Sequence, residues 1–412
     1  MKMKKFITFL VVISTFLLVA CDSSDDNITV AIWDTNQQPG LQLIIDEFTE
    51  ETGIEVELQV IPGGEYWTLL EAGVQGGDMP DVFWMHSDQF QMFADNEILL
   101  DLTEKIDESE ILNLDGFFED IVELYNFDGQ QFAVPKDIDT IALWYNRTMF
   151  EEAGVATPDE TWTWETLLEA AEALTLGDGS QYGIAWNVNN GQEAFYNVIY
   201  SMGGYVINDD QTTSGFDNPN TIEAMEFVDR LIPTMPSIEE MSENGPHILF
   251  PSGMIAMATQ GSWMVSSFSD NDFLLEHANV AVLPMAADGT RVSIYNGLGW
   301  AAAADGPNTE DAWRLIEWFS TEDMQRRQAE LGVTMAAFEG TSDDWANSVP
   351  EFNLQAYLDM TENMVILPHS RNTQAWTHMF ADELIPVWMG ERDMEEVLIE
   401  ISEEMNRLLD LE

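Results

Sequence analysis

Short apolar runs alternate with amphipathic segments through the first part of the chain. Residues 28–33 and 81–85 are apolar enough for buried strands, and residues 54–61 alternate as a half-buried strand does. Between them, residues 41–52 and 66–74 place their apolar side chains at helical spacing. Alternation of strand and helix in this order predicts α/β layers built on a parallel sheet.

The same alternation returns later, and the end of the chain reads as mostly helical. The pattern predicts a long helix over residues 162–174 with Thr161 as its N-cap. Further strands are expected at residues 182–186, 255–258, 280–283 and 298–303. The chain shows no repeat at a fixed period, and its 412 residues are enough for two lobes.

The N-terminus has the pattern of a secretory signal peptide. Three lysines among the first five residues precede an apolar run over residues 6–20, which is short of the ~20 residues that a bilayer span needs. The run ends at Cys21, and a small residue before a cysteine at this place resembles the bacterial lipobox, whose cysteine is acylated. We expect residues 1–20 to be removed, Cys21 to carry a lipid anchor and residues 21–27 to form a tether. An uncleaved anchor helix is the alternative.

The residue types that carry most enzyme and metal chemistry are sparse or badly spaced. Cys21 is the one cysteine of the chain, which excludes an internal disulfide and a thiolate cluster. The five histidines lack metal-ligand spacing, and no zinc-protease helix, nucleophile elbow or phosphate loop is present in the sequence. Carboxylate pairs say little, because acids are so abundant here. We expect no enzyme activity, no cofactor and no metal.

The excess of acidic residues indicates the solution conditions in which the protein works, and it does not identify a catalytic site. The chain has 75 acidic and 14 basic residues, a formal charge of -61, and the acids are scattered rather than gathered in one tail. At 45% hydrophobic it can still build a core. Self-repulsion of this size weakens a compact state in dilute buffer, whereas the Debye length falls to ~3 Å at 1 M salt. We infer a high-salt or alkaline habitat, and no nucleic-acid partner because no basic patch exists.

Five segments in a fixed order carry recognisable motifs. They are residues 77–84, 132–147, 150–165, 250–263 and 297–316. The most specific are Tyr145-Asn146 in the second segment and Gly261-Ser262-Trp263 in the fourth. In order and spacing, the set resembles the family 1 extracellular solute-binding proteins, the group that includes maltose-binding protein, over nearly the whole chain after the signal peptide.

The resemblance implies a two-lobed periplasmic-binding-protein-like fold of type II, with two discontinuous α/β lobes joined by hinge crossovers. The first lobe would hold residues 28–138 and 299–345, and the second residues 139–298 and 346–412. Such folds close on a hinge around a ligand in the cleft. The implied function is the extracytoplasmic, lipid-anchored binding subunit of an ABC importer. It would capture a sugar as a monomer and dock on a membrane permease.

A sugar site needs aromatic surfaces for the C–H faces and carboxylates, amides or Arg forks for the hydroxyls. In α/β sheets such sites lie beyond the carboxyl ends of the strands. By resemblance, Trp84 and Trp263 match stacking aromatics, while Asp88 and Asp139 match hydroxyl-binding carboxylates. The full set of candidates is Trp33, Glu65, Trp84, His86, Asp88, Asp139, Trp186, Trp263, Trp300, Arg371 and Trp376.

Each candidate has a structural alternative. The tryptophans in or beside apolar strands could belong to the core, Asp139 to a hinge turn and Arg371 to a salt bridge. Glu65 could simply start a helix. The family's maltose binder has an acidic-aromatic pair where this chain offers Glu193 and Tyr196, so the size and linkage of the sugar stay open.

Two other classes of function remain as alternatives. The same fold could bind a polyamine, a phosphate ester or a metal, and a polyamine would also use carboxylates and aromatic rings, through cation–π contacts. A secreted glycoside-acting enzyme is the more remote alternative.

Overall fold

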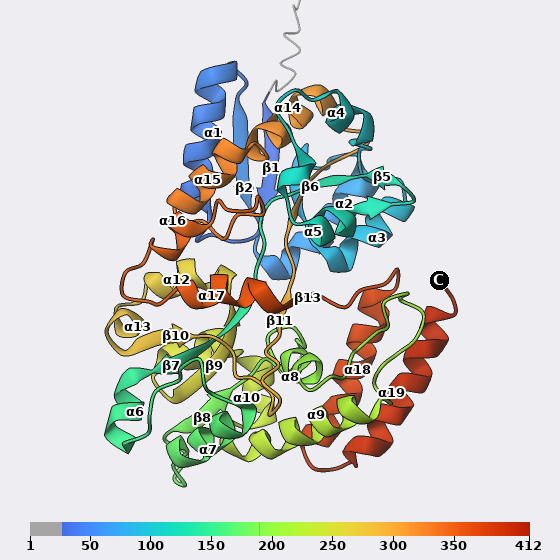
Figure 1. Cartoon of the computed structure of the whole chain (residues 1–412). Coiled ribbons are helices and arrows are strands. Elements are labelled where there is room, and N and C mark those ends of the chain that lie inside the picture. Colours follow the sequence, from blue (N-terminus) through green and yellow to red (C-terminus); the bar gives the residue numbers. More distant parts are fainter. Residues whose placement is uncertain (1–26, 189) are drawn as a thin grey trace, which may run out of the picture.

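Two α/β lobes lie one above the other in the computed structural model (Figure 1). The structure describes residues 27–188 and 190–412. The expected signal peptide and the expected acylation of Cys21 lie outside the described residues.

The first lobe is built on a five-stranded mixed sheet. Its strand order is β2 (Val56–Val60), β1 (Ile28–Ile32), β3 (Val82–Met85), β12 (Gly299–Ala302) and β6 (Ala133–Pro135). β1 runs parallel to β2 and β3, whereas β12 runs antiparallel to both β3 and β6. The expectation of a parallel sheet therefore holds for three strands only, because β12 enters this lobe from the other one and inserts against the strand direction.

The second lobe has a four-stranded sheet in the order β10 (Ala278–Ala281), β7 (Ile141–Asn146), β9 (Ile255–Gly261) and β8 (Tyr182–Ala185). β7 is antiparallel to β10 and β9, and only β8 and β9 run parallel. A parallel sheet is thus the wrong expectation for most of this lobe. Two short strand pairs complete the set: β11 (Ser293–Tyr295) with β13 (Met364–Ile366), and the hairpin β4 (Asn126–Phe127) with β5 (Gln130–Gln131).

Helices surround both sheets. With the first lobe lie α1 (Gln38–Thr52), α2 (Gly63–Gly76), α3 (Ser87–Asp95), α4 (Thr103–Glu108), α5 (Glu119–Leu124), α14 (Thr309–Phe319), α15 (Glu322–Glu330) and α16 (Asp343–Ala346). With the second lie α6 (Arg147–Ala153), α7 (Trp164–Leu174), α8 (Phe195–Ser201), α9 (Pro219–Leu231), α10 (Ile238–Glu243), α11 (Pro246–Leu249), α12 (Val265–Ser269), α13 (Asp272–His277), α17 (Gln355–Asp359), α18 (Thr373–Trp388) and α19 (Met394–Leu409). Short 3-10 turns are η1 (Leu114–Gly116), η2 (Ile232–Thr234), η3 (Phe250–Ser252), η4 (Ser262–Met264) and η5 (Met360–Asn363).

Local sequence accounts for most helix boundaries. α1 buries the apolar stripe that includes Leu41 and Phe48, and Gly53 ends it at a φ of 74°, where its N–H donates to Thr49. The long helix α7 begins two residues later than the pattern predicts. Thr163, rather than Thr161, is its N-cap, since the Thr163 hydroxyl accepts from the N–H of Thr166.

The chain crosses between the lobes at three segments, and the first two pack against each other. Asp139 on the first crossover forms a bridge with Asn296 on the second, and Asp137 pairs with Ala336. A Cβ on Gly297 would lie 2.1 Å from the carbonyl oxygen of Asp137, so only glycine allows this approach. A third passage leads from α16 to α17. The architecture confirms two discontinuous lobes joined by crossovers, while the residue boundaries given for them stay a prediction.

Within the described residues, no helix combines the length and apolar character that crossing a bilayer requires. That same part of the chain holds no cluster of three or more His, Cys, Asp or Glu side chains able to ligate a metal ion.

Candidate functional site

A cavity of about 720 Å³ opens between the two lobes. The first lobe contributes His86 and Asp88, from the turn after β3 and the start of α3. The second lobe contributes residues from the loop before α8, from α8 itself and from one face of α18. Prominent among them are Gln192, Tyr196, Thr377, His378, Phe380 and Asp382. The size lies within the range of small-molecule sites.

A chain of polar contacts runs beside this cavity from one lobe to the other. The Nε2 of Gln192 donates to Asp139 Oδ1 over 2.7 Å, and the backbone N–H of Asn296 donates to the same oxygen over 3.1 Å. Asn296 Nδ2 lies 3.0 Å from His86 Nε2, and His86 Nδ1 lies 3.4 Å from Asp88. The second lobe, both crossovers and the first lobe are therefore linked through five side chains and one backbone group.

The electrostatics of this chain are set by burial and by neighbouring acids. Burial, reinforced by the charge of Asp137, raises the pKa of Asp139 to about 7, against the hydrogen bonds from Asn296 and Gln192. Burial lowers the pKa of His86, but the surrounding carboxylates, Asp88 first among them, outweigh it and leave the pKa raised. Partial burial opposes ionisation of Asp88, yet the charge of His86 brings its pKa below the usual value.

Two buried polar atoms close to the cavity find no hydrogen-bond partner among the described residues. One is the hydroxyl of Tyr196, a cavity-lining residue that is 2% exposed, and the other is Oδ1 of Asn296. An unsatisfied buried polar group costs about 1–3 kcal/mol. A ligand that offers both hydrogen-bond donors and acceptors would remove that cost.

Of the predicted site residues, the structure brings His86 and Asp88 to the cavity wall, with Asp139 one hydrogen bond behind it. Arg371 lies in an adjoining cavity of about 540 Å³, which shares Asp88 and His378 with the first. Its guanidinium pairs with Asp128 over 3.2 Å and lies 4.9 Å from the ring centre of Phe127. In this structure Arg371 therefore forms a salt bridge, which was the alternative to ligand contact.

Several predicted aromatic residues are instead packed in the core. Trp84 and Trp300 are opposite each other across β3 and β12 and are at most 1% exposed. Trp300 stacks on Phe319 with ring centres 4.3 Å apart. Trp84 is covered by Trp33 and by the Nζ of Lys136, which lies 4.5 Å from its ring centre. Both rings are covered by these packed side chains, and neither tryptophan lines the cavity.

Trp186 and Trp376 are also buried, at 2% and 0% exposure. Trp186 packs edge-on against Trp164, and the indole N–H of Trp376 donates to Ser370 Oγ over 2.9 Å. Trp376 acts behind the cavity wall, because its ring stacks on Phe380, which lines the cavity. In this structure both are packing residues, contrary to the expectation of direct ligand contact.

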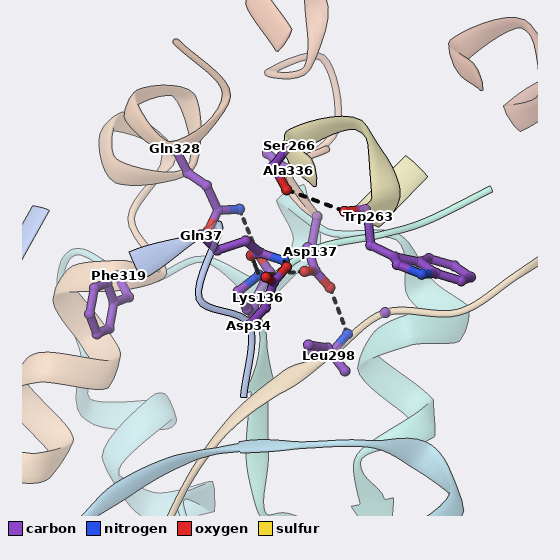
Figure 2. A network of polar contacts seen from close by, with 12 residues as sticks. Asp34, Gln37, Lys136, Asp137, Trp263, Ser266, Leu298, Phe319, Gln328 and Ala336 are labelled. Atoms are coloured by element: carbon purple, nitrogen blue, oxygen red, sulfur yellow. Dashed lines mark hydrogen bonds and ion pairs between the residues drawn. The ribbon is translucent and has the colours of Figure 1, made fainter. Parts of the chain in front are cut away.

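Trp33, Trp263 and Glu65 are more accessible but lie outside the wall of this cavity. Trp33 is half-buried against Tyr66, and Glu65 is exposed at the start of α2. The ring of Trp263 folds over Gly261, where a Cβ would lie 2.0 Å from a ring atom. Figure 2 shows the indole of Trp263 directed away from the Lys136–Asp137 network. A ligand role for these three residues stays a prediction.

That network ties the first crossover to the first lobe (Figure 2). Lys136 is fully buried, and its Nζ donates to Gln37 Oε1 over 2.8 Å and to the carboxylate of Asp137. The other oxygen of Asp137 accepts from the backbone N–H of Leu298 on the second crossover, over 2.7 Å. Neighbouring charges are thereby paired at the base of the hinge.

The residues of α18 that line the cavity were not predicted from the sequence. Thr373, Thr377 and Ala381 are spaced four apart, and His378, Asp382 and Ile385 continue the same helical face. Their spacing was visible in the sequence, but nothing in it placed this late helix opposite His86 and Asp88. Tyr196 was the nearest indication, as the aromatic residue available where the resembling family has one.

Comparison with known proteins gives a consistent result. The family model described as bacterial extracellular solute-binding protein matches residues 33–326. A maltotriose-binding protein from Pyrococcus abyssi is 26% identical over 316 residues, an alignment that covers 74% of this chain and 65% of that relative.

Solved structures share the fold. An ABC substrate-binding protein from Listeria monocytogenes, in complex with cycloalternan, aligns with a TM-score of 0.84 at 23% identity, over 93% of this chain and 99% of that one. A protein from Mycobacterium tuberculosis in complex with glycerophosphocholine aligns with a TM-score of 0.80 at 17% identity, over 93% and 98%. At these identities the likeness describes architecture alone.

Proposed function

Because the chain belongs to the bacterial extracellular solute-binding proteins, we propose that it captures a sugar between its lobes and delivers it to the permease of an ABC importer. The observation that carries this proposal is the interlobe cavity, with unsatisfied polar atoms of Tyr196 and Asn296 beside it. A sugar hydroxyl both donates and accepts hydrogen bonds, so it could pair with the hydroxyl of Tyr196 at the cavity wall.

The side chains of the wall fit a polyhydroxylated ligand. Gln192, Thr377 and Asp88 supply amide, hydroxyl and carboxylate groups from both lobes. Phe380 and Tyr196 also line the cavity, but at 2% exposure each they offer a sugar ring little aromatic surface. Since the wall comes from two lobes, a ligand that contacts both would favour the closed arrangement.

Family membership places the protein outside the cytoplasm. We further propose that it is a monomer held at the membrane by a lipid on Cys21, as its N-terminal pattern predicts. Replacing Cys21 by Ser should abolish incorporation of radiolabelled palmitate and release the protein into the soluble fraction. Continued membrane retention of that variant would overturn the lipid anchor.

A thermal-shift screen of the lipid-free protein tests the ligand class. The panel would hold mono-, di- and oligosaccharides beside polyamines, amino acids and glycerophosphodiesters. A ligand at a hundredfold excess over its Kd stabilises the native state by about 2.7 kcal/mol. A shift with a sugar that is recovered unchanged supports the proposal. A shift with a non-sugar alone would keep the fold and overturn the ligand class, and turnover would favour an enzyme.

The Tyr196→Phe variant localises the site. Removing a hydroxyl that bonds the ligand should weaken binding about tenfold or less, since such bonds contribute about 0.5–1.5 kcal/mol. Tyr182→Phe is the matched control, because Tyr182 is a half-buried tyrosine of the same lobe outside the cavity wall. Equal affinity of the wild type and both variants, measured by titration calorimetry, would remove the Tyr196 hydroxyl from the site.

A further inference from the structure

The wall of the interlobe cavity holds two carboxylates and two histidines among its described lining residues. Asp88 on α3 and Asp382 on α18 face it from opposite lobes, and its described lining residues include no lysine or arginine. Asp382 makes no hydrogen bond or ion pair with another described residue. His86 is the basic group closest to Asp88, and its Nδ1 lies 3.4 Å from that carboxylate.

The adjoining cavity has the same character. It shares Asp88 and His378 with the first and adds Asp95 and Glu412. Arg371, its one arginine among the described lining residues, is held by Asp128 and by the ring of Phe127. The Glu412 carboxylate also accepts from the backbone N–H groups of Arg371 and Asn372, at 3.0 and 2.9 Å.

The positions of these charges affect the binding free energy of a charged ligand. A carboxylate or phosphate drawn into the cavity would lose part of its hydration without meeting a lysine or an arginine among the described lining residues, and a desolvated charge without a partner is costly. It would also meet the carboxylate of Asp382, and although that side chain is solvent-exposed, like charges there still repel by up to about 1 kcal/mol. An ammonium group would find that carboxylate unpaired.

We propose that this cleft selects sugars by charge: it accepts uncharged and amino-bearing sugars, and Asp88 and Asp382 exclude those that carry a carboxylate or phosphate. The proposal rests on the proposed function and deepens it, because it names the class of sugar. The selectivity is assigned to these two side chains and not to the general repulsion that a net charge of -61 exerts on any anion.

The test compares three sets of oligosaccharides at a fixed ionic strength of about 0.15 M, where the Debye length is ~8 Å. Neutral gluco-oligosaccharides, glucosamine oligomers and galacturonate oligomers of equal length are titrated by calorimetry. We expect galacturonates to bind about three- to fivefold more weakly than the best neutral or amino sugar, because repulsion between solvent-exposed charges amounts to about 1 kcal/mol or less.

Two variants and one control identify the residues responsible. Asp382→Asn and Asp88→Asn should each reduce the difference in binding affinity between neutral and anionic sugars. Asp323→Asn removes an equal charge from an exposed helical position on α15 and should leave that difference unchanged. Galacturonates that bind the wild type as tightly as neutral sugars would overturn charge selection and leave the proposed function standing. Failure of every sugar to bind would overturn both.

Discussion

The side-chain amide of Gln192 donates to the carboxylate of Asp139 over 2.7 Å, so the second lobe is tied to the first crossover beside the cavity. Because Asp139 is half-buried and its pKa is shifted, the state of its proton bears on stability. Burial raises its pKa to about 7, from an ordinary value of 3.8.

Asp139 should therefore make stability fall as the pH rises. Between 3.8 and about 7 the folded protein keeps a proton that the unfolded chain has lost, so the free energy of unfolding decreases as the pH passes through that window. In Asp139→Asn this contribution is absent, and the variant should gain stability relative to the wild type from pH 5 to pH 8. Urea unfolding at each pH measures the difference.

The control for this pH effect is Asp323→Asn, which alters an exposed aspartate on α15. Its stability should follow that of the wild type across the same range. A constant difference between Asp139→Asn and the wild type at every pH would show that Asp139 does not titrate in this window.

Arg371 should stabilise the closed arrangement of the lobes. Its guanidinium reaches Asp128 and Phe127 on the hairpin of the first lobe, while its own backbone belongs to the second. Because the pair is exposed, we expect Arg371→Ala to weaken ligand binding by only about 0.2–1 kcal/mol, or up to roughly fivefold. Calorimetric titration with the sugar found by screening measures this.

A double-mutant cycle with Asp128→Ala separates this contact from general charge effects. The two substitutions should be less than additive for ligand affinity. Arg230→Ala, which breaks the exposed Arg230–Glu165 pair within the second lobe, is the control and should leave affinity unchanged. Full additivity of the first two substitutions would exclude a contribution of the Arg371–Asp128 pair to closure.

Lys136 should be far more important for stability than other lysines. It is fully buried between Gln37, Asp137 and the ring of Trp84, so Lys136→Met leaves the Asp137 carboxylate buried without its cation. Breaking a buried pair in this way costs about 3–5 kcal/mol. Denaturant unfolding of the variant gives the value.

Lys105→Met provides the comparison for Lys136, because it removes a lysine whose partner, Glu310, is exposed. It should cost no more than about 1 kcal/mol. Adding Asp137→Asn to Lys136→Met should recover part of the loss. A Lys136→Met protein as stable as the wild type would mean that the buried ion pair makes no net contribution.

Salt should stabilise the whole protein. A charge of -61 repels itself in dilute buffer, and molar salt screens charges more than ~3 Å apart. We expect the melting temperature to rise steeply between about 0.1 M and 1 M potassium chloride, where the Debye length falls from ~10 to ~3 Å. A flat response in scanning calorimetry would indicate that the acidity has a cause other than salt adaptation.

Periodicity predicted the strands and helices well because it reports burial along one element. Ile28–Ile32 and Val82–Met85 form strands where apolar runs predicted them. Hydrophobic periodicity does not tell which other side chains pack on a given strand residue. Trp84 and Trp300 were predicted to contact a ligand, yet Trp33, Lys136 and Phe319 pack on their rings and both are buried.

The candidate site was predictable only where one segment supplied it. His86 and Asp88 follow a strand directly, so the general rule for α/β sheets located them. Asp382 and Thr377 stand almost three hundred residues further along, on a helix whose partner depends on how the lobes meet. Such long-range placement leaves no local trace in a single sequence.

The position of β12 also constrains how the chain can fold. This strand is the fourth of five in the first sheet, between β3 and β6, yet it follows the entire second-lobe sheet along the chain. The first sheet cannot be completed until residue 302 is available, so neither its β3 edge nor β6 has its partner before then. A chain exported from its N-terminus would thus expose an unpaired strand edge for most of its passage. Its assembly depends on the second lobe, and early arrest of export would leave a fragment prone to aggregation.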